Sequence, residues 1–306
     1  MGSASSGSVG SGSLGGTSAG NSDLGTFKSV RGWIAVGGQQ IVAIDPDHPS
    51  LRKVIFPEPG LPMAWSRDGS ELLIQTGDWP NYLYEVLWGD GPLVRVAGPG
   101  GAVQRAWLSP DGAEVRYWDS VNPFALMGVD VRGGTPHVIA RFPTPIASDY
   151  PDLSPDGTRI AFTSILTRAL STMNVDGSHR RRILDDRQGS GHFNDAEFYA
   201  AAWSPDGRRM ALNGFAGGGT ILVNADGADL AHATRLPRSG AVSWSPDGSR
   251  IAIWDVAHLL VMNADGTHVR SIHLARVRRS GSLGWPLWMA WNPMTPASSS
   301  SPLLPN

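Results

Sequence analysis

The stretch WSPDGRRMALNGFAGGGTILVNADG, from Trp203 to Gly227, decides the fold. It opens on the turn Ser204-Pro-Asp-Gly207 and closes on the turn Asn224-Ala-Asp-Gly227. Ser, Pro, Asp and Gly in this order match a type I turn that closes with Gly in the left-handed region. Short apolar segments follow the first turn (209–212) and precede the second (220–223), so the stretch predicts tight antiparallel hairpins.

Both turns recur along the chain. The tetrapeptide Ser-Pro-Asp-Gly occurs four times and once as the variant Ser-Arg-Asp-Gly, with the Asp at positions 68, 111, 156, 206 and 247. These positions are 43, 45, 50 and 41 residues apart. The second turn runs in phase with the first, at 174–177, 224–227 and 263–266, with looser forms at 88–91 and 131–134. Two interleaved turns with one period of about forty residues predict a four-stranded antiparallel unit, which is the size of a propeller blade.

The blade count predicts a closed ring. Residues 32–56 hold the second, third and fourth strands of a blade without its first strand, and residues 287–291 hold a first strand with nothing after it. Pairing these segments completes a sixth blade and removes the open sheet edges. We therefore predict an all-β, six-bladed propeller over residues 30–293. The Gly/Ser-rich leader 1–29 and the Ser/Pro-rich tail 294–306 are expected to be disordered.

One Trp position repeats with the first turn. Trp65, Trp203, Trp244 and Trp291 precede the turn by one residue, and Leu replaces Trp at positions 108 and 153. A residue at the same place in every repeat favours core packing between neighbouring blades. The alternative is a stacking platform for a sugar or base, which would need exposed aromatic residues on one rim.

The pattern Trp203-Ser-Pro-Asp-Gly207…Asn224-Ala-Asp-Gly227, repeated from Trp244 to Gly266, resembles the TolB-like, WD-type β-propeller repeat of bacteria. The resemblance covers nearly all of the expected folded region. It implies a propeller that presents loops and a central channel to a protein partner, and a periplasmic or other extracytoplasmic location. Similar blades also accompany hydrolase domains and occur in some sugar lyases, so the repeat specifies the fold more closely than the function.

Composition excludes several classes of function. The formal net charge is −2, so no global basic field predicts nucleic-acid binding. The chain has no Cys, which excludes thiol catalysis, Cys-ligated zinc and iron–sulfur clusters, and it suits an oxidising compartment. No apolar run reaches the length of a membrane span. We expect a monomer that inserts into no membrane, binds no nucleic acid and needs no cofactor.

Catalytic motifs are missing from the expected fold. The pattern G-x-S-x-G occurs once, at Gly16–Gly20, inside the Gly/Ser leader where no strand–turn–helix context exists. The turn Asp residues lie one per blade and cannot converge on one substrate. The sequence therefore predicts a non-enzymatic protein- or ligand-binding scaffold. The alternatives are a channel-mouth enzyme or small-ligand sensor, such as a carbohydrate lyase or lactonase-like hydrolase, and the sensor half of a larger receptor.

One long repeat suggests where a ligand binds. The spacing of 50 residues includes an insertion at 185–199 that leads into a first strand, near the expected channel. Polar and aromatic residues there, with residues at equivalent positions on other blades, form a candidate ligand site with no catalytic or metal assignment: Arg105, Asp149, Tyr150, His192, Asp195, Glu197, Tyr199 and Trp288. The alternative is a solvated insertion whose aromatic residues pack on the blade edge.

Overall fold

A computed structural model describes residues 30–76, 83–88, 93–97, 103–119, 125–142, 151–164, 169–185, 198–214, 219–229, 233–236, 238, 240–254, 258–274 and 289–293. Strands, turns and bends make up these ranges almost entirely. They contain no helix long and apolar enough to cross a membrane. The predicted leader 1–29 and tail 294–306 lie outside the described residues.

The described strands form six antiparallel sheets of four strands, one per blade. Blade 1 is β24 (Met289–Trp291), β1 (Ile34–Val36), β2 (Ile41–Ile44) and β3 (Arg52–Phe56). Blade 2 is β4 (Leu61–Trp65), β5 (Glu71–Thr76), β6 (Leu83–Trp88) and β7 (Leu93–Ala97). Blade 3 is β8 (Val103–Leu108), β9 (Glu114–Asp119), β10 (Ala125–Asp130) and β11 (His137–Arg141).

The second half repeats this order. Blade 4 is β12 (Asp152–Leu153), β13 (Arg159–Ser164), β14 (Ala169–Asn174) and β15 (Arg181–Asp185). Blade 5 is β16 (Phe198–Trp203), β17 (Arg209–Gly214), β18 (Thr220–Asn224) and β19 (Thr234–Leu236). Blade 6 is β20 (Ala241–Trp244), β21 (Arg250–Trp254), β22 (His258–Asn263) and β23 (Arg270–His273). The all-β, six-bladed prediction is confirmed.

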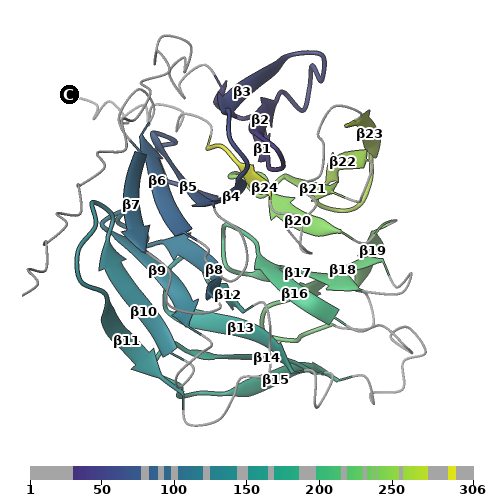
Figure 1. Ribbon diagram of the computed structural model, residues 1–306. Helices are drawn as coiled ribbons and strands as arrows, with labels where there is room; N and C mark the ends of the chain where they lie inside the picture. The colour runs from purple at the N-terminus through teal and green to yellow at the C-terminus, as the bar shows by residue number, and fades with distance from the viewer. Residues whose placement is uncertain are drawn as a thin grey trace, which may run out of the picture.

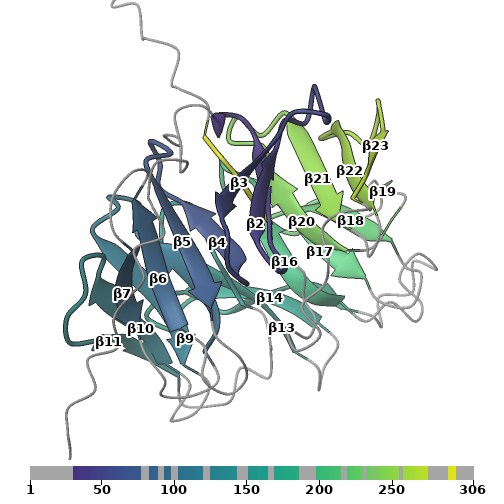
Figure 2. The ribbon, with the colours of Figure 1, turned by 45° about the horizontal axis from the view of Figure 1, so that its top comes forward.

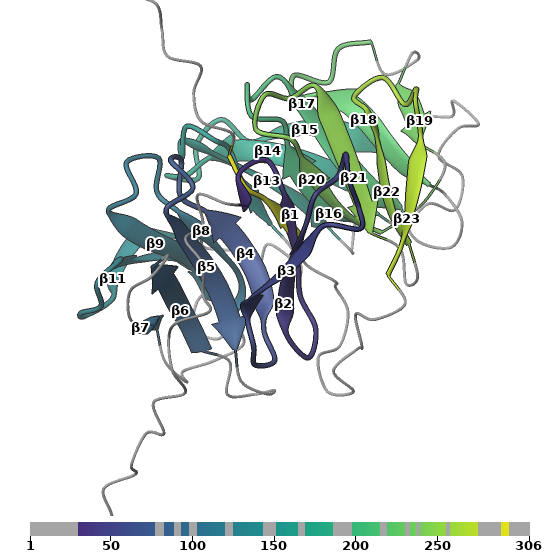
Figure 3. The same cartoon turned by 90° about the horizontal axis from the view of Figure 1, so that it is seen from above.

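The first and last strands close the ring. The blades follow one another around a common centre, and the yellow strand β24 lies between β4 and β20 (Figure 1). β24 pairs antiparallel with β1, with Ala290 opposite Ala35. Two further views show the purple blade 1 between the blue blade 2 and the yellow-green blade 6 (Figures 2 and 3). The predicted pairing of the C-terminal strand with the N-terminal strands is confirmed.

The first turns have the predicted chemistry. Gly69, Gly112, Gly157, Gly207 and Gly248 all have φ between 67° and 73°, the left-handed region that Gly adopts without strain. In each turn the Ser hydroxyl donates to the Asp carboxylate, which also accepts a backbone N–H two residues later. The Asp residues thus hold their own turns, as the sequence indicated.

The hydrophobic core is divided among the blade interfaces. Each of six clusters of buried residues joins two neighbouring blades, including the closing pair, blades 6 and 1. Trp203, Trp244 and Trp291 are each 6 % exposed and belong to these clusters, while Trp65 is half-buried against one of them. The repeated Trp position is therefore core packing between blades, as predicted.

Candidate functional site

Antiparallel strands place the turns at one end of every blade. The connections between first and second strands and between third and fourth strands lie at this end. Most connections at the opposite end lie outside the described residues. We call the described end the turn face and the opposite end the loop face. The 185–199 insertion falls between the end of β15 and the start of β16, two strands that are connected at the loop face.

Arg side chains join neighbouring blades near the turn face. The guanidinium of Arg159 lies 4.7 Å from the ring centroid of Trp203 on the next blade, and that of Arg209 lies 4.9 Å from Trp244. Arg250 repeats the arrangement with Trp291, at 5.1 Å. Each Arg is the first residue of a second strand, directly after its turn. These cation–π contacts fix each blade against the next.

Arg and Trp occur together across three of the six blade interfaces, whereas Trp65 of blade 2 follows a second strand that begins with Ile34. Where the second strand begins with Arg (blades 4, 5 and 6), the next blade has Trp at the repeated position. Where it begins with Glu71 or Glu114 (blades 2 and 3), the next blade has Leu108 or Leu153 instead. A cation stabilises the face of an aromatic ring, whereas a carboxylate is repelled by it. Arg therefore stacks on Trp at the interfaces between blades 4 and 5, 5 and 6, and 6 and 1. The other three interfaces are built from other contacts.

Asp152 is the central polar residue at the interface between blades 3 and 4, where Leu153 stands at the repeated Trp position. It is 6 % exposed and lies in β12, the innermost strand of blade 4. Its Oδ1 accepts hydrogen bonds from Arg105 Nη2 and Trp107 Nε1, both at 2.9 Å, and its Oδ2 accepts one from the backbone N–H of Trp203, also at 2.9 Å. One buried carboxylate thus binds blades 3, 4 and 5 together.

Arg105 is the predicted site residue whose side chain the structure describes. It lies in β8, the first strand of blade 3, and its side chain is 15 % exposed and forms the ion pair with Asp152. Sequence reasoning missed Asp152 itself. Its position holds Ala64, Trp107, Ala202, Ser243 and Ala290 in the other blades, so a charged residue there was a signal that aligning the six first strands would have shown.

The other predicted site residues cannot be placed in the same way. Tyr199 lies in β16, four positions before Trp203, but its side chain lies outside the described part. The remaining six also lie outside the described residues: Asp149, Tyr150, His192, Asp195, Glu197 and Trp288.

The turn-face carboxylates are mostly engaged within the fold. Hydrogen bonds from Ser70 and Ser66 lower the pKa of Asp68, and bonds from Ser204 and the Arg208 N–H lower the pKa of Asp206. Glu71 behaves in the opposite way, because burial and then the nearby charge of Asp68 raise its pKa, against an opposing effect from Arg132. Lowered pKa values reflect carboxylates that the fold stabilises in their charged form.

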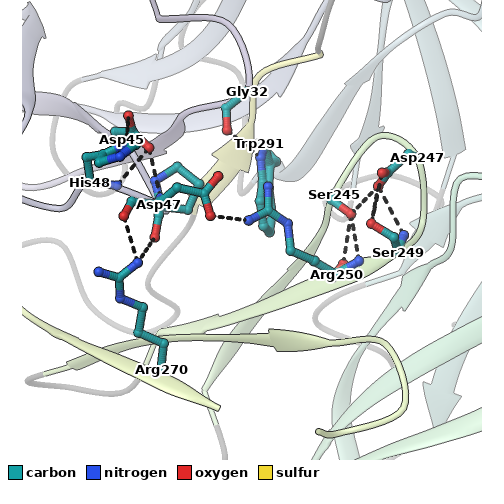
Figure 4. A network of polar contacts seen from close by, with 11 residues as sticks. Gly32, Asp45, Asp47, His48, Ser245, Asp247, Ser249, Arg250, Arg270 and Trp291 are labelled. Carbon is teal, nitrogen blue, oxygen red and sulfur yellow. Dashed lines mark hydrogen bonds and ion pairs between the residues drawn. The ribbon is translucent and has the colours of Figure 1, made fainter. Parts of the chain in front are cut away.

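A polar network joins blade 6 to blade 1 at the point of closure (Figure 4). Arg250 Nη1 donates to Asp47 Oδ1 at 2.8 Å, and Arg270 Nη1 donates to the Asp47 carbonyl oxygen at 2.7 Å. Within blade 1, Trp291 Nε1 of β24 donates to the carbonyl oxygen of Gly32, which precedes β1, at 2.7 Å and so joins the two ends of the ring. We call these contacts the closing seam. They add polar bonds to the short β1–β24 pairing.

Within the described ranges, no group of three or more His, Asp or Glu side chains is placed to hold a metal ion. The described charged groups discussed above therefore serve the frame of the ring: turns, interblade contacts and the closing seam. This frame holds the loop-face ends of the described strands of six blades around one centre.

No protein-family model matches the sequence, and no curated protein does. Among solved structures, TolB from Acinetobacter baumannii is similar with a TM-score of 0.64 and 16 % identity, over 86 % of this chain and 67 % of that one. A TolB candidate from Agrobacterium tumefaciens gives 0.54 and 21 %, over 79 % and 88 %. A chain of the nidogen/laminin complex gives 0.62 and 13 %, over 85 % and 97 %. These likenesses confirm the TolB-like propeller fold.

Proposed function

We propose that this propeller is a non-enzymatic binding scaffold whose loop face and central channel receive a protein partner. The supporting observation is that the described charged side chains named below make contacts within the fold. The first-turn Asp carboxylates are held by their own turns, Arg159, Arg209 and Arg250 stack on the next blade, and Asp152 accepts three internal bonds. A frame organised in this way resembles a rigid support that presents loops.

The proposed binding residues are the eight of the candidate ligand site. Arg105 in β8 and Tyr199 in β16 belong to innermost strands, and Asp152 is bonded to both strands through Arg105 and the Trp203 N–H. The contributions from blades 3 and 5 are thus tied to one carboxylate. Arg105 keeps 15 % of its side-chain surface exposed while it is paired with Asp152. The proposal includes a monomer in an extracytoplasmic compartment, without nucleic acid or cofactor.

Quantitative affinity capture from the native host tests this function. The baits are the wild-type chain, the variant His192→Ala/Glu197→Ala/Tyr199→Ala, and a matched turn-face variant, Arg67→Ala/Thr267→Ala, at exposed positions. We expect specific host proteins to be enriched by the wild type and the turn-face variant and lost with the loop-face variant. Equal capture by all three baits would contradict the assigned face.

A turnover assay separates the scaffold from the alternatives. The purified chain is incubated with oligosaccharides and lactones, and product is followed by mass spectrometry. The scaffold predicts no turnover. A turnover abolished by His192→Ala or Glu197→Ala would replace the proposal with a channel-mouth enzyme.

A further inference from the structure

Two histidines that are fifteen positions apart in the sequence lie opposite each other in blade 6. His258 begins β22, His273 ends β23, and the two residues are partners in the antiparallel register. Their ring centroids are 5.4 Å apart, and the ring planes are inclined by 52°. Cross-strand partners project from the same face of a sheet, so both imidazoles occupy one side of the blade. His258 is half-buried and His273 is exposed.

We propose that His258 and His273 form a two-imidazole site for a divalent transition metal ion such as Zn²⁺. Imidazole nitrogen is a preferred ligand of zinc, copper and nickel, and each bond from nitrogen to zinc is about 2.0–2.1 Å long. Two imidazole rings whose centroids are 5.4 Å apart are close enough for one nitrogen of each ring to reach a single ion between them. Water completes the coordination, since His273 is exposed to solvent.

The other described histidines do not form such a pair. His179 and His268 hold their Nδ1 atoms against the side chains of their own turns, within 2.9–3.1 Å of Asn, Ser or Thr. His48 contacts Asp45, and His137 lies 3.4 Å from Glu114. Among the six histidines whose positions are described, only His258 and His273 have their rings in contact with each other.

The metal would act where the ring closes. Arg52 of blade 1 donates to the His273 carbonyl oxygen at 3.0 Å, and Arg270 in the same strand reaches the Asp47 carbonyl oxygen. The outer strand β23 is therefore a member of the closing seam. An ion bound by His258 and His273 links β23 to β22 and so supports the seam in addition to the backbone pairing. We infer that bound metal stabilises the closed ring.

Calorimetric titration of the tag-free chain with ZnCl₂ tests the site. We expect one tight Zn²⁺ per chain, and an affinity loss of about tenfold or more for His258→Gln and for His273→Gln. The double variant should lose little more than either single variant, because one remaining imidazole no longer chelates. The matched controls His179→Gln and His268→Gln should keep the wild-type affinity.

Thermal unfolding supplies the second readout. Without added metal, the variants should melt close to the wild type, which shows that they fold. Zn²⁺ should raise the thermal unfolding midpoint of the wild type but not that of the double variant. A ligand that binds the native state stabilises that state by mass action. Zinc affinity that is unchanged in the double variant, or reduced equally by the control variants, would overturn the site.

Discussion

At the scale of single residues, the Asp of the repeated turn holds the turn in its conformation by accepting hydrogen bonds. In blade 6 the Ser245 hydroxyl donates to Asp247, which also accepts bonds from the N–H and hydroxyl of Ser249 (Figure 4). For this carboxylate the hydrogen bonds lower the pKa although burial, the largest single influence, raises it. A protonated Asp would keep its shape but lose much of its strength as an acceptor.

The lowered pKa values of the turn carboxylates predict acid sensitivity with a definite sign. Their ordinary pKa is 3.8, and in the folded chain the pKa values of Asp68, Asp111, Asp156, Asp206 and Asp247 are lower. The unfolded chain therefore binds more protons in this range, so the stabilisation is complete above about pH 5 and is lost as the pH falls through about 4 and below. Urea midpoints measured from pH 7 to pH 3 should show a plateau and then a decline. In the variant Asp68→Asn/Asp206→Asn the decline should be shallower.

Glu71 should make stability depend on pH in the opposite direction. Its pKa is raised by burial and by the charge of Asp68, so ionised Glu71 costs stability as the pH rises through its folded-state pKa. Glu71→Gln should raise the thermal midpoint at pH 7 by about 1 °C, and the gain should vanish near pH 4. Glu114→Gln is the matched control, because Glu114 begins the second strand of blade 3 and lies 3.6 Å from Arg116. A midpoint lowered by Glu71→Gln would show that the carboxylate is needed in its charged form.

At the scale of strands and blades, the interfaces are of two kinds. Arg209 stacks on Trp244 of the next blade and also donates to the Gly248 carbonyl oxygen at 3.4 Å, and Arg159 does the same with Trp203 and Gly207. The interface between blades 3 and 4 instead relies on Asp152. Sequence-identical turns thus support chemically different contacts around one ring.

A double-mutant cycle on Arg209 and Trp244 measures the stacked interface. Arg209→Ala, Trp244→Leu and the double variant should give a coupling free energy of about 1 kcal/mol in urea unfolding, as expected for a cation over an indole ring. Arg208→Ala is the control, because Arg208 is exposed and adjacent in sequence. Coupling between Arg208 and Trp244 as large as that between Arg209 and Trp244 would contradict the geometry.

Replacing Asp152 tests the other interface. Asp152→Ala leaves the Arg105 guanidinium, Trp107 Nε1 and the Trp203 N–H without their acceptor, and should cost about 3 kcal/mol in urea unfolding. Adding Arg105→Met should recover part of this loss, because the unpaired charge is then removed. If the two substitutions are additive, Arg105 and Asp152 do not depend on each other.

The sequence predicted the strands and turns but not these contacts, for a physical reason. Turn type depends on four neighbouring residues, so Ser-Pro-Asp-Gly is readable locally. The Asp152 site joins positions 45 to 51 residues apart, and the His258–His273 pair depends on hairpin register. Arg at 159, 209 and 250 repeats in the sequence with the periodic Trp, so an Arg–Trp contact could have been predicted. The closed ring was needed to show that each Arg contacts the Trp of the next blade.

At the scale of the whole molecule, one ring accounts for part of the unusual composition. The chain has 38 Gly and 12 Trp. Five Gly residues close the first turns with positive φ, and four Trp residues occupy the repeated position before the turn. The 306 residues that could have held two domains instead include six blades, each buried against both neighbours. The proposed binding function depends on this closure, because an open ring would not hold loops of different blades at fixed positions.

Closure itself can be measured with a disulfide, since the natural chain has no Cys. Ala35 and Ala290 are directly opposed in β1 and β24, and opposed positions in antiparallel strands lie within the Cα separation that a disulfide spans. We expect Ala35→Cys/Ala290→Cys to oxidise fully, to lose both free thiols in a thiol assay and to stay monomeric. The out-of-register pair Ala35→Cys/Met289→Cys should keep its thiols. Free thiols in the first variant, or equal oxidation of both variants, would contradict a ring closed by β24 on β1.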